Sequence, residues 1–504
     1  MRKLPTEKGI KGIKIEIKGD RRGGEMPYIK GENRNQITLF PEAVDDYITP
    51  DNPVRVIEAF VDSLDMKELG FKRTTPNDVG RPAYDPRDLL KLYLYGYLNR
   101  IRSSRKLEAE AGRNVELMWL LKKLKPDFKT IADFRKDNKK AIKNVFKQFN
   151  LLCKEWELFG CEVIAVDGSK FRACNSKRNN YNDKKIKRHL KYLDEKISNY
   201  LKELDSNDQE EADTHIPSAE EIKKRIEELK KRKAKYQAMQ KEMKEKKIDE
   251  ISTTDPDARL MKVNNNGVDV CYNVQTAIDQ KNKLIVDYDV INNAADQGNL
   301  YEMAEKAKET LGVEEIKALA DKGYYSTSDL KKCEGNKIET YVAKPKNTGS
   351  VANPDFHQDR FQYDQEQNIY ICPAGQTLYP SRIRKINGVE YQDYKNFRAC
   401  KQCELKDQCT SSKKGRTISR NLCQELLDEI DKRTQENKEL YAQRQMLAEH
   451  PFGTIKRIWG YSHFLTKGLE SVKTESALSF LAYNLRRAIN ILGVEEMIRK
   501  LTPA

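Results

Sequence analysis

The stretch VIAVDGSKF, Val163 to Phe171, constrains the fold of this chain most strongly. Its apolar run ends at Asp167, which is the pattern of a buried strand followed by a polar residue. ALADKGYYS, Ala318 to Ser326, repeats the pattern and places Asp321 after the apolar run. Active sites of α/β sheets usually lie at the carboxyl ends of strands. We therefore expect both aspartates at one end of a single sheet, although either one alone could simply cap the following turn.

A third acid occurs in YAQRQMLAEHPFGTIKRIWGY, which spans residues 441–461. Here Glu449 stands among candidate phosphate-contacting residues, namely Tyr441, Arg444, Lys456 and Arg457. Burying an ionised carboxylate costs several kcal/mol without a compensating charge, and Mg²⁺ prefers oxygen ligands. Two such ions roughly 3.5–4 Å apart could activate a water or a 3′-hydroxyl and stabilise the leaving oxygen. Three carboxylates are about the minimum protein contribution to such a pair.

Strand-like and helical patterns alternate around the two aspartates. β-rich runs are expected at residues 161–166, 268–278, 284–291, 316–320 and 338–343, with a helix over 297–311. This order predicts a mixed sheet with helices, in the α+β or α/β class. Between the first two strands, apolar residues step by three or four along residues 186–204 and again along 222–243. Two charged amphipathic helices around one loop predict an antiparallel helical hairpin.

The region from Asp51 to about Trp156 has a helical pattern throughout. Asp85 and Pro86 open one helix as a cap and a first-turn proline. A short helix from Arg105 to Ala111 and a second from Val115 to Lys123 flank Gly112. This arrangement suits a helix-turn-helix that contacts DNA, while an ordinary helical bundle is the alternative. The basic residues that would make the contact are Arg105, Lys106 and Arg113.

The charge balance points to a polyanionic partner. The 504 residues include 93 Lys and Arg against 78 Asp and Glu, which gives a formal net charge of +15. Nucleic acid is the usual partner of such a surplus, although lysine-rich composition can also serve solubility alone. No apolar run approaches the roughly 18 residues of a membrane span, and the basic N-terminus lacks the apolar core of a secretory signal. We expect a soluble intracellular protein.

Four of the ten cysteines, Cys372, Cys400, Cys403 and Cys409, follow the pattern C-x27-C-x2-C-x5-C. Four thiolates with one close pair suit tetrahedral Zn²⁺, which would fold a loop too poor in apolar residues to fold alone. An iron–sulfur cluster also takes four cysteines, and unliganded thiols are a third possibility. The other cysteines are scattered and are expected to be packing residues.

Taken together, VIAVDGSKF, ALADKGYYS and the order Y-x2-R-x4-E-x6-K resemble the DDE transposases of bacterial insertion sequences. The resemblance is to the branch with an N-terminal helical domain and a Tyr-Arg-Glu-Lys signature. SSRKLEAEAGRNVELMWLL, PDFKTIADFR and YNVQTAID are also similar to segments of that family, and the resemblance covers roughly residues 30–495. The common signature has three residues between Arg and Glu, whereas this chain has four.

The resemblance implies an RNase H-like core, with acids on the first and fourth strands and Glu449 on a later helix. Asp167, Asp321 and Glu449 would bind two Mg²⁺ or Mn²⁺ ions for strand cleavage and transfer, and Tyr441, Arg444 and Lys456 would contact DNA phosphates. The partners would be element ends and target DNA, held by a homodimer or larger assembly at the bacterial nucleoid. Five helical steps turn Arg444 about 140° from Glu449, and Pro451 predicts a helix break beside Glu449.

The expected organisation has seven parts. It comprises a basic arm (1–35), a helical DNA-binding domain (36–156), a first core segment (157–183), the hairpin (184–249), a second core segment (250–345), a Cys-rich insertion (346–425) and a last core segment (426–504) with the catalytic Glu. A nuclease or resolvase on the same fold remains an alternative function. A DNA-binding protein whose catalytic site has decayed is another.

Overall fold

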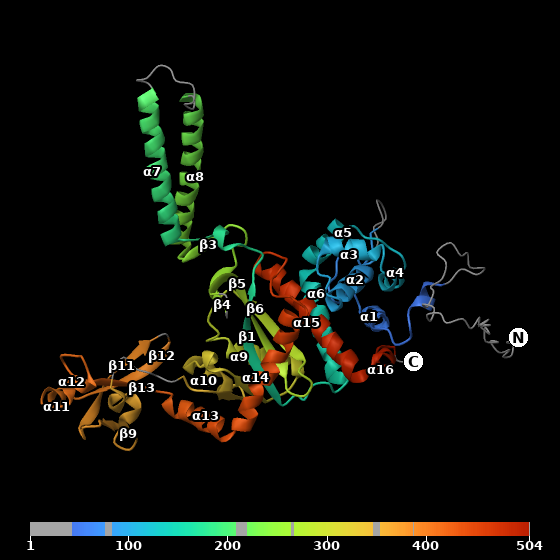
Figure 1. The fold of residues 1–504 in the computed structure, drawn as a ribbon. Coiled ribbons are helices and arrows are strands. Elements are labelled where there is room, and N and C mark those ends of the chain that lie inside the picture. Colours follow the sequence, from blue (N-terminus) through green and yellow to red (C-terminus); the bar gives the residue numbers. More distant parts are fainter. Residues whose placement is uncertain are drawn as a thin grey trace, which may run out of the picture.

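The computed structural model describes residues 43–75, 83–207, 219–263, 267–345, 353–386 and 388–502. The basic arm expected over residues 1–35 lies outside these ranges. Figure 1 shows a central body of sheet and helices, from which a long helical hairpin and a β-rich lobe project on different sides. Among the described residues, no helix is long and apolar enough to cross a membrane.

The N-terminal part of the central body is helical. Its elements are η1 (Val44–Tyr47), α1 (Pro53–Asp62), α2 (Pro86–Leu98), α3 (Ser104–Ala111), α4 (Val115–Leu120), α5 (Phe128–Asp137) and α6 (Lys139–Glu155). The expected start of α2 is confirmed, because the Asp85 side chain accepts a hydrogen bond from the Arg87 N–H. The second helix of the expected helix-turn-helix ends three residues early, at Leu120 rather than at Lys123. Lys122 and Lys123 adopt positive φ values of 52° and 62°, which no α-helix accommodates.

The main sheet is mixed and has the order β4-β5-β1-β7-β8, with β6 also paired to β5. Its strands are β1 (Val163–Arg172), β4 (Arg259–Val263), β5 (Gly267–Asp279), β6 (Ile285–Ile291), β7 (Ile316–Ala320) and β8 (Ile338–Val342). β1, β7 and β8 are parallel, whereas β5 is antiparallel to β1, β4 and β6. This order is compatible with an RNase H-like core.

Strand β1 differs from the expected strand in its length. It continues five residues past Asp167 to Arg172, because β5 pairs with β1 over its whole length, from Ile164 to Arg172. The parallel pairing with β7 stops where expected, at Val166 opposite Ala320. Asp167 therefore follows the end of the parallel ladder but not the end of the strand.

Helices cover both faces of this sheet. α9 (Leu300–Leu311), α6 and α15 (Leu469–Leu492) pack on one face, and α14 (Lys438–Phe452) packs on the other. Further helices are η3 (Lys322–Tyr324), α10 (Thr327–Gly335), α13 (Gln424–Glu436), the π-helix η6 (Gly453–Ile458) and α16 (Val494–Leu501), the last of which packs on α1 and α15. The helical N-terminal part and the sheet share one hydrophobic core. The DNA-binding and catalytic parts expected from the sequence are thus packed together.

Two buried asparagines join the helices to β6. The Asn484 Nδ2 of α15 donates to Asn150 Oδ1 at 2.9 Å and to the Ile285 carbonyl at 2.8 Å, and its Oδ1 accepts from the Ile285 N–H at 2.9 Å. The Asn150 Nδ2 of α6 donates to the carbonyls of Ile285 and Val286. Because both side chains are almost completely buried, each hydrogen bond is made out of contact with water.

The projecting hairpin consists of α7 (Asp183–Asn207) and α8 (Ala219–Lys246). The antiparallel strands β2 (Asn180–Asn182) and β3 (Glu250–Ser252) close its base. Ile186, Met239 and Met243 are buried between the helices near that base. Ile222 and Ile226, which the sequence periodicity assigned to the seam, are buried as well.

The Cys-rich region is not the loop that we expected. It contains η4 (Pro354–Phe356), η5 (Gln358–Arg360), β9 (Gln362–Asp364), β10 (Ile369–Ile371), β11 (Thr377–Ile386), β12 (Val389–Lys395), α11 (Phe397–Lys401), α12 (Lys406–Cys409) and β13 (Thr417–Asn421). The strands form a second sheet in the order β13-β12-β11-β10-β9. Phe361, Tyr370, Leu378, Tyr394 and Ile418 build a separate core for it. The expectation was wrong because aromatic residues on the strands supply this core. We call the region the β-rich lobe.

The asparagine pair gives a test of the fold. We expect Asn484→Ala to lower the free energy of unfolding by about 2–4 kcal/mol, because it leaves Ile285 N–H and Asn150 Oδ1 buried without partners. Urea unfolding of the full chain measures the change. Asn437→Ala is the control, since the exposed Asn437 side chain makes a similar bond to the Arg433 carbonyl. Equal effects of the two substitutions would contradict a stabilising role for the buried pair.

Candidate active site

The register of β1 and β7 brings Asp167 and Asp321 together. Val166 stands opposite Ala320 in the parallel ladder, so the next residue of each strand is an aspartate. Side chains alternate between the two faces of a sheet. Val163 and Ala165 face α14 in the same cluster as Leu319, and two further steps along each chain place Asp167 and Asp321 on this face. The two carboxylates therefore lie side by side beneath α14.

The electrostatic surroundings of Asp167 are unfavourable to its charged form. Burial raises the pKa of Asp167 to about 6, and the nearby negative charges of Asp321 and Asp296 contribute to the increase. The Gly168 N–H and Arg444 lower this pKa and offset part of the increase. Asp321 is better solvated, and its Oδ1 accepts a hydrogen bond from the Gly323 N–H at 2.7 Å. The pair is therefore short of positive charge, and a hard cation would supply it.

Helix α14 supplies a cation to this site. Its Leu447 is completely buried against Val163, Ala165, Leu319 and Tyr341, which fixes the helix on the sheet. Arg444, one turn earlier, is close enough to Asp167 to lower its pKa. The Arg444 guanidinium carbon lies 5.8 Å from the ring centroid of Tyr441. Within the described residues, the buried Arg444 Nε has no hydrogen-bond partner, so this donor is unsatisfied.

Glu449 lies on the same helix but is exposed, and its Oε1 accepts from the Gln445 side chain at 3.0 Å. The prediction of a helix break at Pro451 is wrong. α14 continues to Phe452 and passes into η6, because Pro451 and Phe452 are buried against the core and their packing offsets the missing hydrogen bond. As the side chains stand, the described residues include no group of three or more His, Cys, Asp or Glu that could hold a metal ion.

Lys456 is already engaged within the protein. Its Nζ donates to Ser169 Oγ at 2.9 Å and to the Lys170 carbonyl at 2.7 Å, and it lies 4.6 Å from the centroid of the Phe171 ring. Burial lowers the pKa of this amine. Lys456 thus ties η6 to the part of β1 that extends past Asp167. Its neighbour Arg457 is exposed.

A polar network that the sequence did not suggest lies on the opposite face, beneath Gly168. The Asp296 carboxylate accepts from the side chains of Lys170, Asn273 and Gln275, at 3.0, 2.7 and 2.8 Å. The buried Tyr324, which follows Asp321 closely, donates its hydroxyl to Gln275 Oε1. A Cβ on residue 168 would clash with the side chains of Gln275 and Asp296, so a larger residue would displace the network. Asp296 bonds to residues far away in the sequence, and no spacing pattern could reveal it.

Comparison with known families gives two matches. Residues 42–137 match the model described as Transposase domain (DUF772), and residues 371–489 match the Transposase DDE domain. Both models describe transposases. Together they support a DDE-type transposase, an enzyme that acts on DNA. No curated protein and no solved structure matches the chain.

The two matched segments cover different parts of the chain. The first contains helices α1 to α5, and the second contains α14 with Arg444 and Glu449, together with the four cysteines. Asp167 and Asp321 lie outside both segments, so their assignment depends on the geometry of the sheet. The second match therefore covers the helix that the fold packs over these two acids.

The helix-turn-helix residues have different surroundings. Arg105 is exposed, with its guanidinium 4.9 Å from the Phe128 ring centroid, and Lys106 is exposed as well. Arg113 forms an exposed ion pair with Glu110. α4 packs on the helical part through Leu117 and Leu120, which are completely buried, whereas Val115 at its start is exposed. The four cysteines line a separate pocket in the β-rich lobe.

The raised pKa of Asp167 predicts a pH-dependent stability. The pKa of Asp167 is about 6 in the folded state, against the ordinary aspartate value of 3.8 in the unfolded state. The folded state therefore keeps a proton between about pH 4 and pH 6 that the unfolded state releases. The stability of the wild type therefore falls as pH rises through this window. We expect Asp167→Asn to match the wild type near pH 4 and to exceed it at pH 8 by up to about 3 kcal/mol.

Urea unfolding at both pH values, in buffers with a chelator of divalent ions, measures this difference. Asp359→Asn is the control, because Asp359 is exposed and lies in the β-rich lobe. A difference between wild type and Asp167→Asn that is the same at both pH values would contradict the burial of this carboxyl group.

Proposed function

We propose that this protein is a DNA transposase of the Tyr-Arg-Glu-Lys branch, which binds the ends of its own insertion sequence, cleaves them and transfers the 3′-hydroxyl ends to target DNA. The observation that carries the proposal is the pairing of Asp167 with Asp321 beneath α14, in a chain with two transposase matches. The action would take place at the bacterial nucleoid, in the cytoplasm.

The acid pair fits a divalent metal on chemical grounds. Two neighbouring carboxylates, one of them destabilised by burial and by the other, gain most from a cation with a preference for oxygen ligands. Asp167, Asp321 and Glu449 would hold two Mg²⁺ or Mn²⁺ ions. Such ions, when bound, lower the pKa of an attacking water or hydroxyl and stabilise the charge on the leaving oxygen.

Glu449 is the best third acid because of the helix on which it lies. Near the start of β1, the Gln280 side chain donates to Gln443 of α14, and the Gln280 N–H donates to the Val163 carbonyl. At the far end of β1, the rings of Phe171 and Phe452 pack with centroids 6.1 Å apart. The helix therefore runs along β1 and carries Glu449 past the level of Asp167. Asp296, the other nearby acid, bonds to residues on the opposite face.

The other residues of the site would bind and orient DNA. Arg444 would contact a phosphate oxygen of the bound DNA, and Tyr441 lies beside its guanidinium. Lys456 would act mainly by holding β1 in place, since its amine is already bonded to that strand. Arg457, with Arg105, Lys106 and Arg113 of the helical part, would contact the backbone of the element ends.

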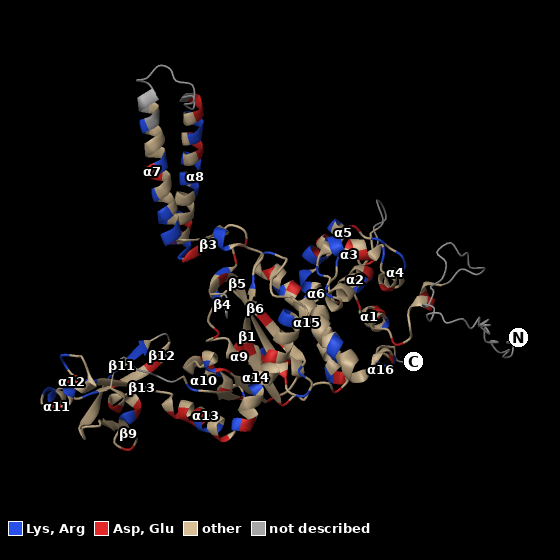
Figure 2. Cartoon of the chain, in the orientation of Figure 1, with Lys and Arg blue, Asp and Glu red and all other residues tan. Residues whose placement is uncertain are grey.

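Basic residues outside the site offer further contact area. Lys and Arg occur along α3, α5, α7 and α8 and in the lobe around β12 (Figure 2). The net charge of +15 would give DNA binding a strong dependence on salt. Because both element ends must be held at once, we propose that the active complex is a homodimer or a larger assembly.

Metal binding can be tested without DNA. We expect millimolar Mg²⁺ to raise the melting temperature of the wild type, because a ligand that binds only the folded state stabilises it. The increase should be absent in Asp167→Asn and should persist in Glu439→Gln, a change of an exposed acid near the start of α14. Equal stabilisation of all three proteins would contradict a metal site at Asp167.

Strand transfer is the decisive test. The full chain is incubated with Mg²⁺ or Mn²⁺, DNA that carries the flanking ends of its own element, and a target plasmid. We expect joined products that decrease at least about 100-fold in Asp167→Asn, Asp321→Asn and Glu449→Gln, because each removes a charge that the reacting centre needs. Glu439→Gln should retain wild-type activity. Arg444→Lys should lose activity in part, since a point charge replaces a planar two-donor contact.

The same assay separates the rival functions. Cleavage without joining would indicate a nuclease or resolvase on this fold. Specific binding to the ends without cleavage in either metal would indicate a DNA-binding protein with a decayed site. If Glu449→Gln kept full activity while both aspartate variants lost it, the proposed role of Glu449 would be refuted and the roles of the two aspartates would stand.

A further inference from the structure

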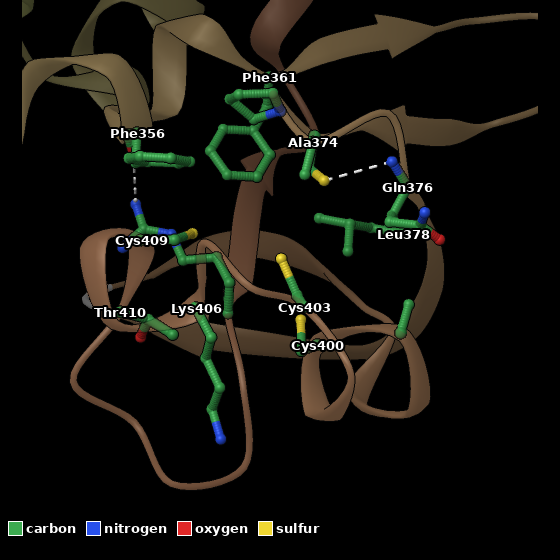
Figure 3. Close-up of a pocket in the computed structure, with 14 residues that line it drawn as sticks. Phe356, Phe361, Ala374, Gln376, Leu378, Cys400, Cys403, Lys406, Cys409 and Thr410 are labelled. Carbon is green, nitrogen blue, oxygen red and sulfur yellow. Dashed lines mark hydrogen bonds between the residues drawn. The ribbon is translucent and has the colours of Figure 1, made fainter.

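Four cysteines from distant parts of the β-rich lobe line one small pocket (Figure 3). Cys372 follows β10, Cys400 belongs to α11, Cys403 follows that helix, and Cys409 is the last residue of α12. The pocket has a volume of about 30 Å³, and its other lining residues include Phe356, Phe361 and Leu378, together with polar residues such as Arg416. It is therefore large enough for a single water or ion.

The four thiols share this small pocket. All four cysteines are partly buried there. None of the cysteines forms a disulfide, so all four sulfurs carry protons or negative charge. Grouping four ionisable thiols among apolar side chains is unfavourable to each of them unless a cation joins the group.

The backbone around two of the cysteines is arranged closely about their sulfurs. The Gln376 N–H approaches Cys372 Sγ at 3.4 Å in a tight turn, which the Gly375 N–H closes by donating to the Cys372 carbonyl at 2.8 Å. A donor directed at sulfur stabilises a thiolate more than a thiol. On the other side, Gly415 (φ 128°) passes so close to Cys400 that a Cβ would lie 3.0 Å from Cys400 Sγ.

We propose that these four cysteines bind one structural Zn²⁺ ion as a tetrahedral tetrathiolate site. In the described residues the side chains do not yet form a chelating group, so binding requires rotation about the Cα–Cβ bonds until each sulfur lies about 2.3 Å from the ion. Each ligand releases its thiol proton to solvent, and the resulting complex carries two negative charges. Arg416, which also lines the pocket, would compensate part of that charge.

The ion would fix the two short helices of the lobe to its sheet. Neither α11 nor α12 contains a buried residue, whereas the sheet has its own aromatic core. The packing that holds these helices is therefore weak without the metal. Because Cys372 lies beside the sheet and the other ligands on or near the helices, one ion would cross-link the two parts. Its loss should loosen residues 397–416 and leave the sheet folded.

The metal content of the full chain tests this proposal independently of any transposition activity. We expect about one zinc per chain, measured by mass spectrometry after dialysis, and less than about 0.2 in Cys403→Ser, because three sulfurs bind zinc far more weakly than four. Cys423→Ser is the matched control, since this partly exposed cysteine lies outside the pocket, and it should retain the zinc. Cys403→His should also retain zinc, because imidazole can replace a thiolate.

Cobalt provides a second readout that does not depend on any variant. Protein refilled with Co²⁺ should show the intense visible bands of tetrahedral thiolate coordination, and zinc should abolish them. A metal-free wild type, a zinc content unchanged by Cys403→Ser, or octahedral cobalt spectra would each overturn the proposal. A brown protein that contains iron and acid-labile sulfide would overturn it in favour of an iron–sulfur cluster.

Discussion

Two carboxylates on neighbouring parallel strands are the constraint around which this structure is built. The register that sets Val166 opposite Ala320 also sets Asp167 beside Asp321, where burial and the charge of Asp321 disfavour the charged form of Asp167. Such a pair keeps its position only if the surrounding structure holds both strands firmly. β1 is hydrogen-bonded to β5 on one edge and to β7 on the other. Lys456 donates hydrogen bonds to the part of β1 that extends past Asp167. On the opposite face of the sheet, the Asp296 network contacts the same strand and occupies the space that a side chain at residue 168 would need.

The helical N-terminal part depends on the same sheet. α6 and α15 bond to the backbone of β6 through Asn150 and Asn484. Arg102 forms a buried ion pair with Glu475 of α15 at 3.2 Å and donates to the His463 carbonyl. Removing either partner of such a pair leaves an uncompensated charge in the core. DNA bound by the helical part would therefore be held at a fixed position relative to the two acids.

The hairpin and the β-rich lobe are each stabilised by contacts of their own. The hairpin is closed at its base by β2 and β3, and the lobe has its own sheet and core. Both project from the central body (Figure 1). Because each has its own packing, neither is needed to complete the main sheet. They extend the surface that a long, charged partner such as DNA could contact.

The sequence by itself determined the order of the strands, the two aspartates after apolar runs, the amphipathic hairpin and the four spaced cysteines. These features follow from local periodicity and from residue chemistry, both of which can be read along the chain. It did not determine that α14 continues through Pro451, or that Arg444 comes close enough to Asp167 to lower its pKa. Nor did it indicate that Lys456 binds β1, that Asp296 supports Gly168, or that the Cys-rich region has its own sheet. Only the tertiary structure decided these points. The contacts of Arg444, Lys456 and Asp296 depend on which face of an element meets residues more than a hundred positions away. The sheet of the Cys-rich region depends on aromatic side chains that several short strands contribute to one core.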